Sequence, residues 1–310
     1  MAASNSTRFP TASGWSALPA EYAIPAKPPS LAEAQAYCKR LATSHYENFS
    51  VVTWFLPARL HQHFYNVYAY CRISDDLGDE VGDSQQSLLL MDEWESELNA
   101  CYAGNPRHPV FVALRETVQK CEIPKEPFVN LLTAFRQDQV VTRYQTFEDV
   151  RGYCRNSADP VGRLVLYVCG YRDADRQRLS DYTCTALQLA NFWQDVTVDY
   201  AKNRIYLPLE DLRAFGVTEE QISQRRCTPG FIDLMKFEVQ RAREWFERGL
   251  PLAAMLEKEL AIDIELFSRG GQEILNAIEA QGYDVLRSRP ALSRRRKFLL
   301  LARAAVRRFV

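Results

Sequence analysis

Residues 72–80 read RISDDLGDE, a short segment dominated by acidic side chains. Asp75 and Asp79 are four residues apart, so on a helix they lie one above the other on the same face. Like charges at this spacing repel one another. The segment is therefore either a solvated acidic surface or one wall of a metal site, and the residues around it have to distinguish the two.

The residues before this segment favour a face that is otherwise buried. Pro57 is expected to begin a helix that continues through the acidic segment. The apolar side chains of this helix fall near one stripe, and the stripe runs into Asp75 and Asp79. A patch of purely solvated charge would more naturally lie on the opposite face. The apolar residues that lead to the two acids are Leu60, Phe64, Val67 and Cys71.

A second polar stripe occurs in residues 191–199, NFWQDVTVD, where Asn191, Asp195 and Asp199 are spaced by four. If the two stripes face each other, carboxylates and an amide gather in one cavity, and burying that charge without a counterion costs many kcal/mol. Divalent cations remove this cost, and a ligand set made only of oxygen selects a hard ion such as Mg²⁺. The apolar neighbours of this stripe are Leu189, Phe192, Trp193 and Val196.

The composition is that of a soluble globular protein, with 47% hydrophobic and 25% charged residues among 310. The formal net charge of −1 gives no electrostatic argument for a nucleic-acid partner. The eight cysteines contain no CxxC pair, so we read them as reduced core residues. We find no N-terminal signal and no apolar run of membrane-spanning length. The expected location is cytoplasmic.

The chain divides into an arm and one helical domain. Residues 1–29 are rich in Ser, Ala and Pro and read as an irregular arm, after which Ser30 and Glu33 form a capping box. Pro160 is expected to kink or break the helix around it. The range 30–310 contains no linker and no repeat, which predicts a single all-α domain. Further helices are expected at 84–103, 109–120, 125–143, 175–201, 230–257 and 260–281, with a last one in the tail.

The two acidic motifs resemble those of the squalene/phytoene synthases. The resemblance covers about residues 31–300 and rests on DDLGD, on NFWQDVTVD followed by NRIYLP, and on HYENFSVVTWFLP, YCRNSADPVG and GYDVLRSRPALSRRRKFLLL. It implies the class I isoprenoid (terpenoid) synthase fold, an all-α helical bundle with a central cavity. It also implies an enzyme that uses Mg²⁺, with Mn²⁺ as a possible substitute, to release diphosphate from a prenyl diphosphate.

Within the family, HYENF, DDLGDE, YCRNSADPVGRLVL and NFWQDVTVDYAKNRIYLPLEDL resemble the hydroxysqualene synthase branch of bacterial hopanoid biosynthesis. This resemblance implies a carbon–oxygen lyase that takes presqualene diphosphate, expels diphosphate and captures the rearranged cation with water. Phytoene and dehydrosqualene synthases usually carry small Ala and Gly residues after YC, whereas this chain has YCRNSADPVG. The difference argues against the first condensation step in this chain.

Two alternatives stay open. A head-to-head prenyltransferase would make presqualene diphosphate, squalene or phytoene from farnesyl or geranylgeranyl diphosphate. A non-catalytic helical scaffold would retain the fold without the chemistry, although both acidic motifs are intact. The chain has no GxGxxG fingerprint, so we expect no nicotinamide cofactor.

The resemblance also assigns roles to individual residues. Asp75 and Asp79 are expected to hold the metal from one wall, and Asn191, Asp195 and Asp199 from the other. The acids of these motifs thereby serve catalysis, because the metal stabilises the leaving diphosphate. The residues expected to bind the substrate are His45, Phe49, Arg72, Gln188, Lys202, Arg204 and Tyr206.

Several of these side chains have a structural alternative. Arg72 could form an ion pair on its own helix, and Lys202 could be solvated. Tyr153 corresponds to the family's cavity tyrosine and could instead be a packed core residue. Asp159 is expected to position the capturing water or to take its proton, and the alternative is a capping role before Pro160.

The C-terminal segment from Val285 to Val310 has nine basic residues and no acidic ones. One interpretation is a transient contact with a membrane surface, at the inner face, where a lipid substrate would partition. The other is a final core helix with a solvated basic face.

Overall fold

The computed structural model describes Trp15, residues 18–44 and residues 57–291, and these ranges contain helices and irregular segments but no β-strand. The only β-type pairing in them is an isolated bridge between Arg143 and Ile205. The predicted all-α class is thereby confirmed. The helices are η2 Ala20–Tyr22, α1 Leu31–Ser44, α4 Ala58–Asp79, α5 Ser84–Ala103, α6 Pro109–Lys120, α7 Glu126–Gln137, α8 Phe147–Ser157, α9 Asp159–Val168, α10 Ala174–Gln194, α11 Val196–Ala201, α12 Leu209–Ala214, α13 Glu219–Ser223, α14 Pro229–Gly249, η3 Leu250–Met255 and α15 Lys258–Ala280.

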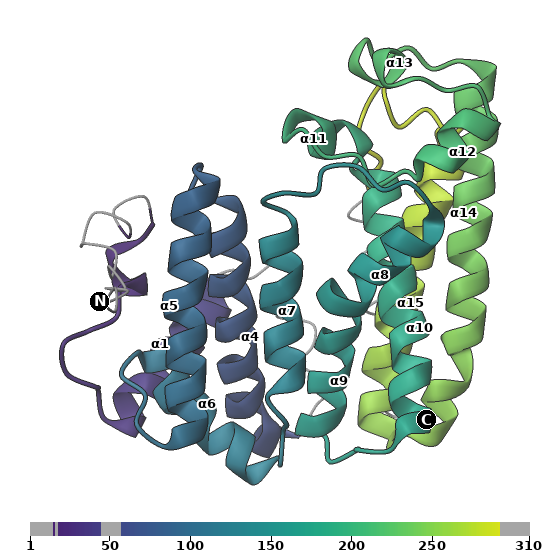
Figure 1. The fold of residues 1–310 in the computed structure, drawn as a ribbon. Helices are drawn as coiled ribbons and strands as arrows, with labels where there is room; N and C mark the ends of the chain where they lie inside the picture. The colour runs from purple at the N-terminus through teal and green to yellow at the C-terminus, as the bar shows by residue number, and fades with distance from the viewer. Residues whose placement is uncertain (1–14, 16–17, 45–56, 292–310) are drawn as a thin grey trace, which may run out of the picture.

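The long helices form two groups that lie side by side. In Figure 1, α1, α4, α5 and α6 lie at the left, and α8, α10, α14 and α15 at the right. Between them, α7 packs on α4 and α8, while α9 packs on α10 and α7. The C-terminal ends of α4 and α10 both point toward the end of the bundle that carries α11 (Figure 1). The topology therefore brings the two acidic motifs to one end of the molecule.

Local signals in the sequence explain most helix boundaries. The backbone N–H of Ser30 donates to a Glu33 carboxylate oxygen at 2.8 Å just before α1, as the capping box predicts. Capping boxes at Thr146 and Thr218 begin α8 and α13 in the same way. Pro160 lies in the first turn of α9, and the chain breaks between α8 and α9 at Ala158. The predicted break at this proline is confirmed.

Three predicted helices are shorter than expected. The helix predicted for 175–201 ends at Gln194, and Asp195 separates it from α11 with φ −105° and ψ 16°. Val196, Thr197 and Val198 follow directly, and β-branched residues have lower helix propensity. The helices predicted for 125–143 and 230–257 likewise end at Gln137 and Gly249. The break after Gln194 matters for function because it redirects Asp195.

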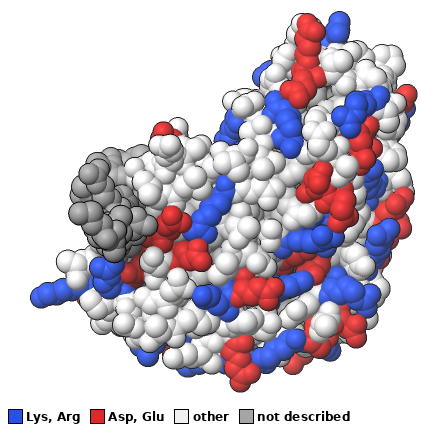
Figure 2. Space-filling view, in the orientation of Figure 1, with Lys and Arg blue, Asp and Glu red and all other residues white. Residues whose placement is uncertain are grey.

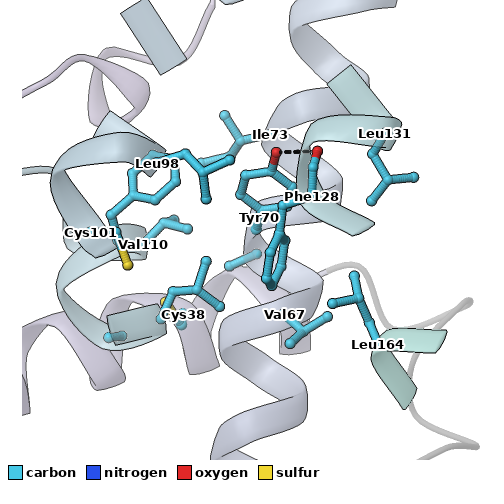
Figure 3. Close-up of a cluster of buried hydrophobic side chains, with 14 of the residues drawn as sticks. Cys38, Val67, Tyr70, Ile73, Leu98, Cys101, Val110, Phe128, Leu131 and Leu164 are labelled. Atoms are coloured by element: carbon cyan, nitrogen blue, oxygen red, sulfur yellow. Dashed lines mark hydrogen bonds between the residues drawn. The ribbon is translucent and has the colours of Figure 1, made fainter. Parts of the chain in front are cut away.

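The interior is divided into two apolar clusters. In the first, Tyr70 of α4 is fully buried, and its hydroxyl donates to the carbonyl oxygen of Phe128 at 2.8 Å. Figure 3 shows this bond surrounded by apolar side chains from α1, α5, α6, α7 and α9. The second cluster centres on Trp193, Phe231 and Phe246 from α10 and α14. The first cluster joins mainly α1, α4, α5, α6 and α7, and the second joins mainly α8, α10 and α14.

The described surface carries charges of both signs. Figure 2 shows Lys and Arg mixed with Asp and Glu over the face in view. No helix in the described ranges is long and apolar enough to cross a lipid bilayer. The membrane-contact hypothesis refers to the segment from Val285 to Val310, of which the structure describes Arg287 and Arg289, whereas the basic residues from 294 onward lie outside the described residues.

Close packing at one glycine of α15 gives a test of the fold. A Cβ atom at Gly271 would lie 2.4 Å from Phe246 Cζ and 2.8 Å from Leu187 Cδ2, whereas one at Gly270 would meet no atom within 4 Å. We expect Gly271→Ala to lower the free energy of unfolding by about 1–3 kcal/mol through overpacking. Gly270→Ala is the matched control and should raise it by about 0.5–1 kcal/mol, because Ala favours helix. Urea unfolding measures both, and equal effects would contradict the packing of α15 on α10 and α14.

Candidate active site

A cavity of about 380 Å³ lies between the two helix groups and is lined by residues of α4, α7, α8, α9, α10, α11 and the segment after α11. Acidic, basic and aromatic side chains share its wall. The two polar stripes therefore do face each other, as their apolar flanks indicated. Among the residues predicted from the sequence, the cavity is lined by Arg72, Asp75, Asp79, Tyr153, Gln188, Asn191, Asp199, Arg204 and Tyr206.

The first wall is the C-terminal end of α4. Asp79 accepts hydrogen bonds from Lys202 Nζ at 2.8 Å and from Arg204 Nη1 at 2.9 Å. Burial alone would raise the pKa of Asp79, but these two bonds and charges bring it below its ordinary value. Asp75 has a looser cationic partner, because Arg72 Nη1 lies 3.9 Å from Asp75 Oδ2. Burial in the concave wall and the neighbouring Asp79 charge raise the pKa of Asp75 to about 6, although its side chain is still 51% exposed and solvent moderates the effect.

Arg72 combines both interpretations that the sequence left open. It lines the cavity, 3.9 Å from Asp75, and its Nε also donates to Asp76 Oδ2 at 3.1 Å. Asp76 is buried and accepts a second bond from the Tyr22 hydroxyl at 2.8 Å. Asp76 thus orients the guanidinium, and a residue of the N-terminal arm helps to hold Asp76.

The second wall comes from α10 and α11. Asn191 and Asp199 line the cavity, and burial together with the Asp195 charge raises the pKa of Asp199 to about 7. Asp195 itself is not among the lining residues. Its carboxylate is paired with Arg289, whose Nη2 lies 3.0 Å from Asp195 Oδ2. In this structure the helix breaks at Asp195 and Arg289 holds its carboxylate, while the expected role of Asp195 as a metal ligand stays a prediction.

The segment after α11 reaches the first wall through ion pairs of Lys202 and Arg204 with Asp79. Arg204 and Tyr206 line the cavity, and Lys202 reaches Asp79 while its side chain remains 46% exposed. Arg289, which the sequence placed only in the basic tail, adds another cation beside the second acidic motif. His45 and Phe49 lie outside the described residues.

Asp138 is a cavity residue that sequence reasoning missed. It follows the last residue of α7 and is 8% exposed. Its carboxylate accepts hydrogen bonds from the Tyr153 hydroxyl at 2.7 Å and from the Tyr206 hydroxyl at 3.2 Å. A signal was available, since Phe128, Leu131 and Phe135 form an apolar stripe that runs into Asp138. This is the same pattern that identified Asp75.

Asp159 does not reach the cavity. It is 2% exposed and forms an ion pair with Arg151 at 2.9 Å and a hydrogen bond from the Thr185 hydroxyl at 2.8 Å. The cavity is lined instead by its neighbours Ser157 and Val161. The Asp159 carboxylate thus joins α8, α9 and α10 in this structure, which is a structural role, while its expected role with the capturing water stays a prediction.

The donor set of the cavity fits a hard divalent cation. Asp75, Asp79, Asn191 and Asp199 all offer oxygen ligands, and burial together with neighbouring carboxylate charges raises the pKa values of Asp75 and Asp199. In the described ranges, no three His, Cys, Asp or Glu side chains form a preformed metal cage. An open arrangement suits Mg²⁺, which usually keeps waters and takes phosphate oxygens as further ligands.

Comparison with known proteins agrees with this geometry. The sequence pattern of the squalene/phytoene synthase family matches residues 42–296. A 15-cis-phytoene synthase from Synechococcus elongatus is 30% identical over 300 residues, which cover 92% of this chain and 97% of the relative. The crystal structure of squalene synthase HpnC from Alicyclobacillus acidocaldarius has a TM-score of 0.78 and 46% identity, covering 87% of this chain and 98% of that one. A dehydrosqualene synthase solved with a ligand has a TM-score of 0.81 and 26% identity, covering 89% and 96%.

Proposed function

Since this chain belongs to the squalene/phytoene synthase family, whose members are prenyltransferases of isoprenoid biosynthesis, we propose that it is a Mg²⁺-dependent hydroxysqualene synthase. The substrate would be presqualene diphosphate, and the products hydroxysqualene and diphosphate. The observation that carries the proposal is the cavity in which two acidic walls meet beneath Lys202 and Arg204. The choice of branch is supported by the YCRNSADPVG segment and by the 46% identity to HpnC.

The charged residues of the cavity would bind the metal and the diphosphate. Asp75, Asp79, Asn191 and Asp199 would hold Mg²⁺, which when bound neutralises charge on the leaving diphosphate. Arg204 and Lys202 are placed to bind phosphate oxygens, a task for which guanidinium geometry is well suited.

The apolar part of the cavity wall suits a cation. Phe135, Phe192 and Leu131 line the cavity together with the charged residues, and the Phe192 ring stacks on Tyr206 with centroids 3.8 Å apart. Aromatic faces stabilise positive charge and exclude bulk water. Such a wall favours a reaction in which a carbocation forms before a single water captures it.

The proposed activity can be tested with two substrates. Purified protein with Mg²⁺ is expected to convert presqualene diphosphate to hydroxysqualene, and to give no product from farnesyl diphosphate alone. Chelation by EDTA should lower the rate at least about 10²-fold, since a metal supplies several kcal/mol of charge stabilisation, and added Mg²⁺ should restore it. Products are identified by gas chromatography with mass spectrometry.

The second candidate is a head-to-head prenyltransferase, which is favoured by curated relatives named phytoene synthase. Formation of presqualene diphosphate, squalene or phytoene from allylic diphosphates in the same assay would establish this candidate. It would also exclude the hydroxysqualene proposal.

A further inference from the structure

The structure leaves open which group receives the proton when water captures the cation, because Asp159 lies outside the cavity. Three acids of the cavity wall are the proposed ligands of the Mg²⁺ that would bind diphosphate: Asp75, Asp79 and Asp199. Asp138 differs from them, because its hydrogen-bond partners among the described residues are two neutral phenols, Tyr153 and Tyr206. It is therefore a buried carboxylate in the cavity wall with no direct ion pair in the described part of the chain.

The geometry of the two tyrosines allows a relay. Each hydroxyl donates its proton to Asp138, at 2.7 Å for Tyr153 and 3.2 Å for Tyr206, so each phenolic oxygen retains lone pairs that can accept a hydrogen bond. Both tyrosines and Asp138 line the cavity. Burial holds the pKa of both phenols above their ordinary value, so the phenols stay neutral and can pass a proton on without acting as the final base.

We propose that Asp138 is the catalytic base of water capture, reached through the hydroxyl of Tyr153 or Tyr206. This inference rests on the proposed hydroxysqualene synthase activity. In the step, the water oxygen forms a C–O bond with the cationic carbon while one of its O–H bonds breaks. The released proton moves to the tyrosine oxygen as that tyrosine passes its own proton to Asp138. No electrons are gained or lost, and Asp138 then returns the proton to solvent.

The negative charge of Asp138 would also stabilise the carbocation electrostatically before water captures it. A fixed anion in a partly dry, aromatic wall stabilises developing positive charge more strongly than it would in water. Burial raises the pKa of Asp138 to about 6, while hydrogen bonds from the tyrosines lower it, so the group is ionised at neutral pH yet able to hold a proton. The charged and titratable groups that face it are Tyr153, Arg204, Tyr206, Asp79 and Tyr144.

The test is Asp138→Asn, which keeps the size and one acceptor for a tyrosine while removing the base. With presqualene diphosphate and Mg²⁺, we expect hydroxysqualene formation to fall about 10²-fold, the lower end of general-base effects. Elimination products should take a larger share of the total, and KM should stay within about threefold because substrate binding rests on other residues. Glu238→Gln is the matched control, since Glu238 is a buried acid of α14 paired with Arg241 and absent from the cavity wall.

The pH dependence gives an independent readout. In the wild-type protein, the alcohol share of the products should fall as pH drops through about 6, the pKa of Asp138. In Asp138→Asn this dependence of the share should disappear, and the total rate of product formation is measured separately in both proteins. If Asp138→Asn does not fold, as judged by circular dichroism, Tyr153→Phe and Tyr206→Phe together interrupt the relay and should lower the alcohol share in the same way.

The outcomes separate the two proposals. An unchanged alcohol share in the folded variants, or a pH dependence that persists in Asp138→Asn, would overturn the assignment of Asp138 and leave hydroxysqualene synthesis intact. A wild-type protein that forms no hydroxysqualene would overturn both.

Discussion

Replacing Asp79 by Asn is expected to reduce diphosphate release from presqualene diphosphate by about 10³-fold, because several kcal/mol of charge stabilisation depend on this carboxylate. Asp79 is the point at which the two halves of the site meet. Its carboxylate oxygens accept hydrogen bonds from Lys202 and Arg204, which lie in the segment after the second acidic motif. Asp79 also lines the same cavity wall as Asp75. The substitution would thus remove a proposed metal ligand and weaken its ion pairs with Lys202 and Arg204, for which we propose a role in diphosphate binding.

The measurement is a steady-state assay of diphosphate release at several Mg²⁺ concentrations. We expect the half-saturating Mg²⁺ concentration to rise as well as kcat to fall, because a neutral amide is a weaker ligand than a carboxylate. Glu80→Gln is the control, since Glu80 is the exposed cap residue that follows Asp79 and does not line the cavity. If folded Asp79→Asn keeps more than a tenth of wild-type activity at low Mg²⁺, the carboxylate has no role in ionisation.

The sequence predicted those parts of the site that depend on helical periodicity. Asp75, Asp79, Asn191 and Asp199 were correctly expected in one cavity, because each continues an apolar stripe and such stripes face the interior. The helix that carries Asp75 and Asp79 was also predicted, whereas Asn191 and Asp199 lie on α10 and α11, which the sequence predicted as one helix. The expectation that the two acidic stripes face each other followed from the cost of burying like charges without a counterion. Helical periodicity and elementary electrostatics were therefore sufficient to predict that the two acidic stripes meet in one cavity.

What escaped prediction depends on contacts between distant residues. The orientation of Asp195 is decided by Arg289, 94 positions later, and a helical wheel contains no such partner. Asp138 follows an apolar stripe like that of Asp75, but it has no second acid at helical spacing that would draw attention to it. Its role becomes visible only when Tyr153 and Tyr206 converge on it.

Asp159 illustrates the reverse case, a residue singled out from the sequence that lies in a buried ion pair. In sequence, an acid beside Pro160 in a segment that differs from related enzymes looks like a determinant of the product. In the structure, Arg151 lies eight residues earlier and forms an ion pair with Asp159 in which the side chains are 11% and 3% exposed. Whether a carboxylate serves chemistry or architecture depends on the position of its counterion, and sequence alone does not give that position.

Arg151→Met is accordingly expected to lower the free energy of unfolding by about 3–5 kcal/mol, since it leaves the buried Asp159 charge without its partner. Adding Asp159→Asn to this variant should recover part of the loss. The matched control is Arg155→Met, one turn later on α8, where the ion pair with Glu148 is more than half exposed on both sides and is worth about 0–1 kcal/mol. Urea unfolding followed by circular dichroism measures all three variants.

The pH dependence of this loss has a definite sign. Burial raises the pKa of Asp159 to about 6 even with Arg151 present, and removing the arginine should raise the pKa further. The folded variant therefore binds a proton more readily than the unfolded chain, and its deficit relative to wild type should shrink as pH falls from 8 toward 5. Equal losses for Arg151→Met and Arg155→Met, or a deficit that does not change with pH, would show that Asp159 is not held as a buried ion in this protein. Asp159 would then again become a candidate for the reaction itself.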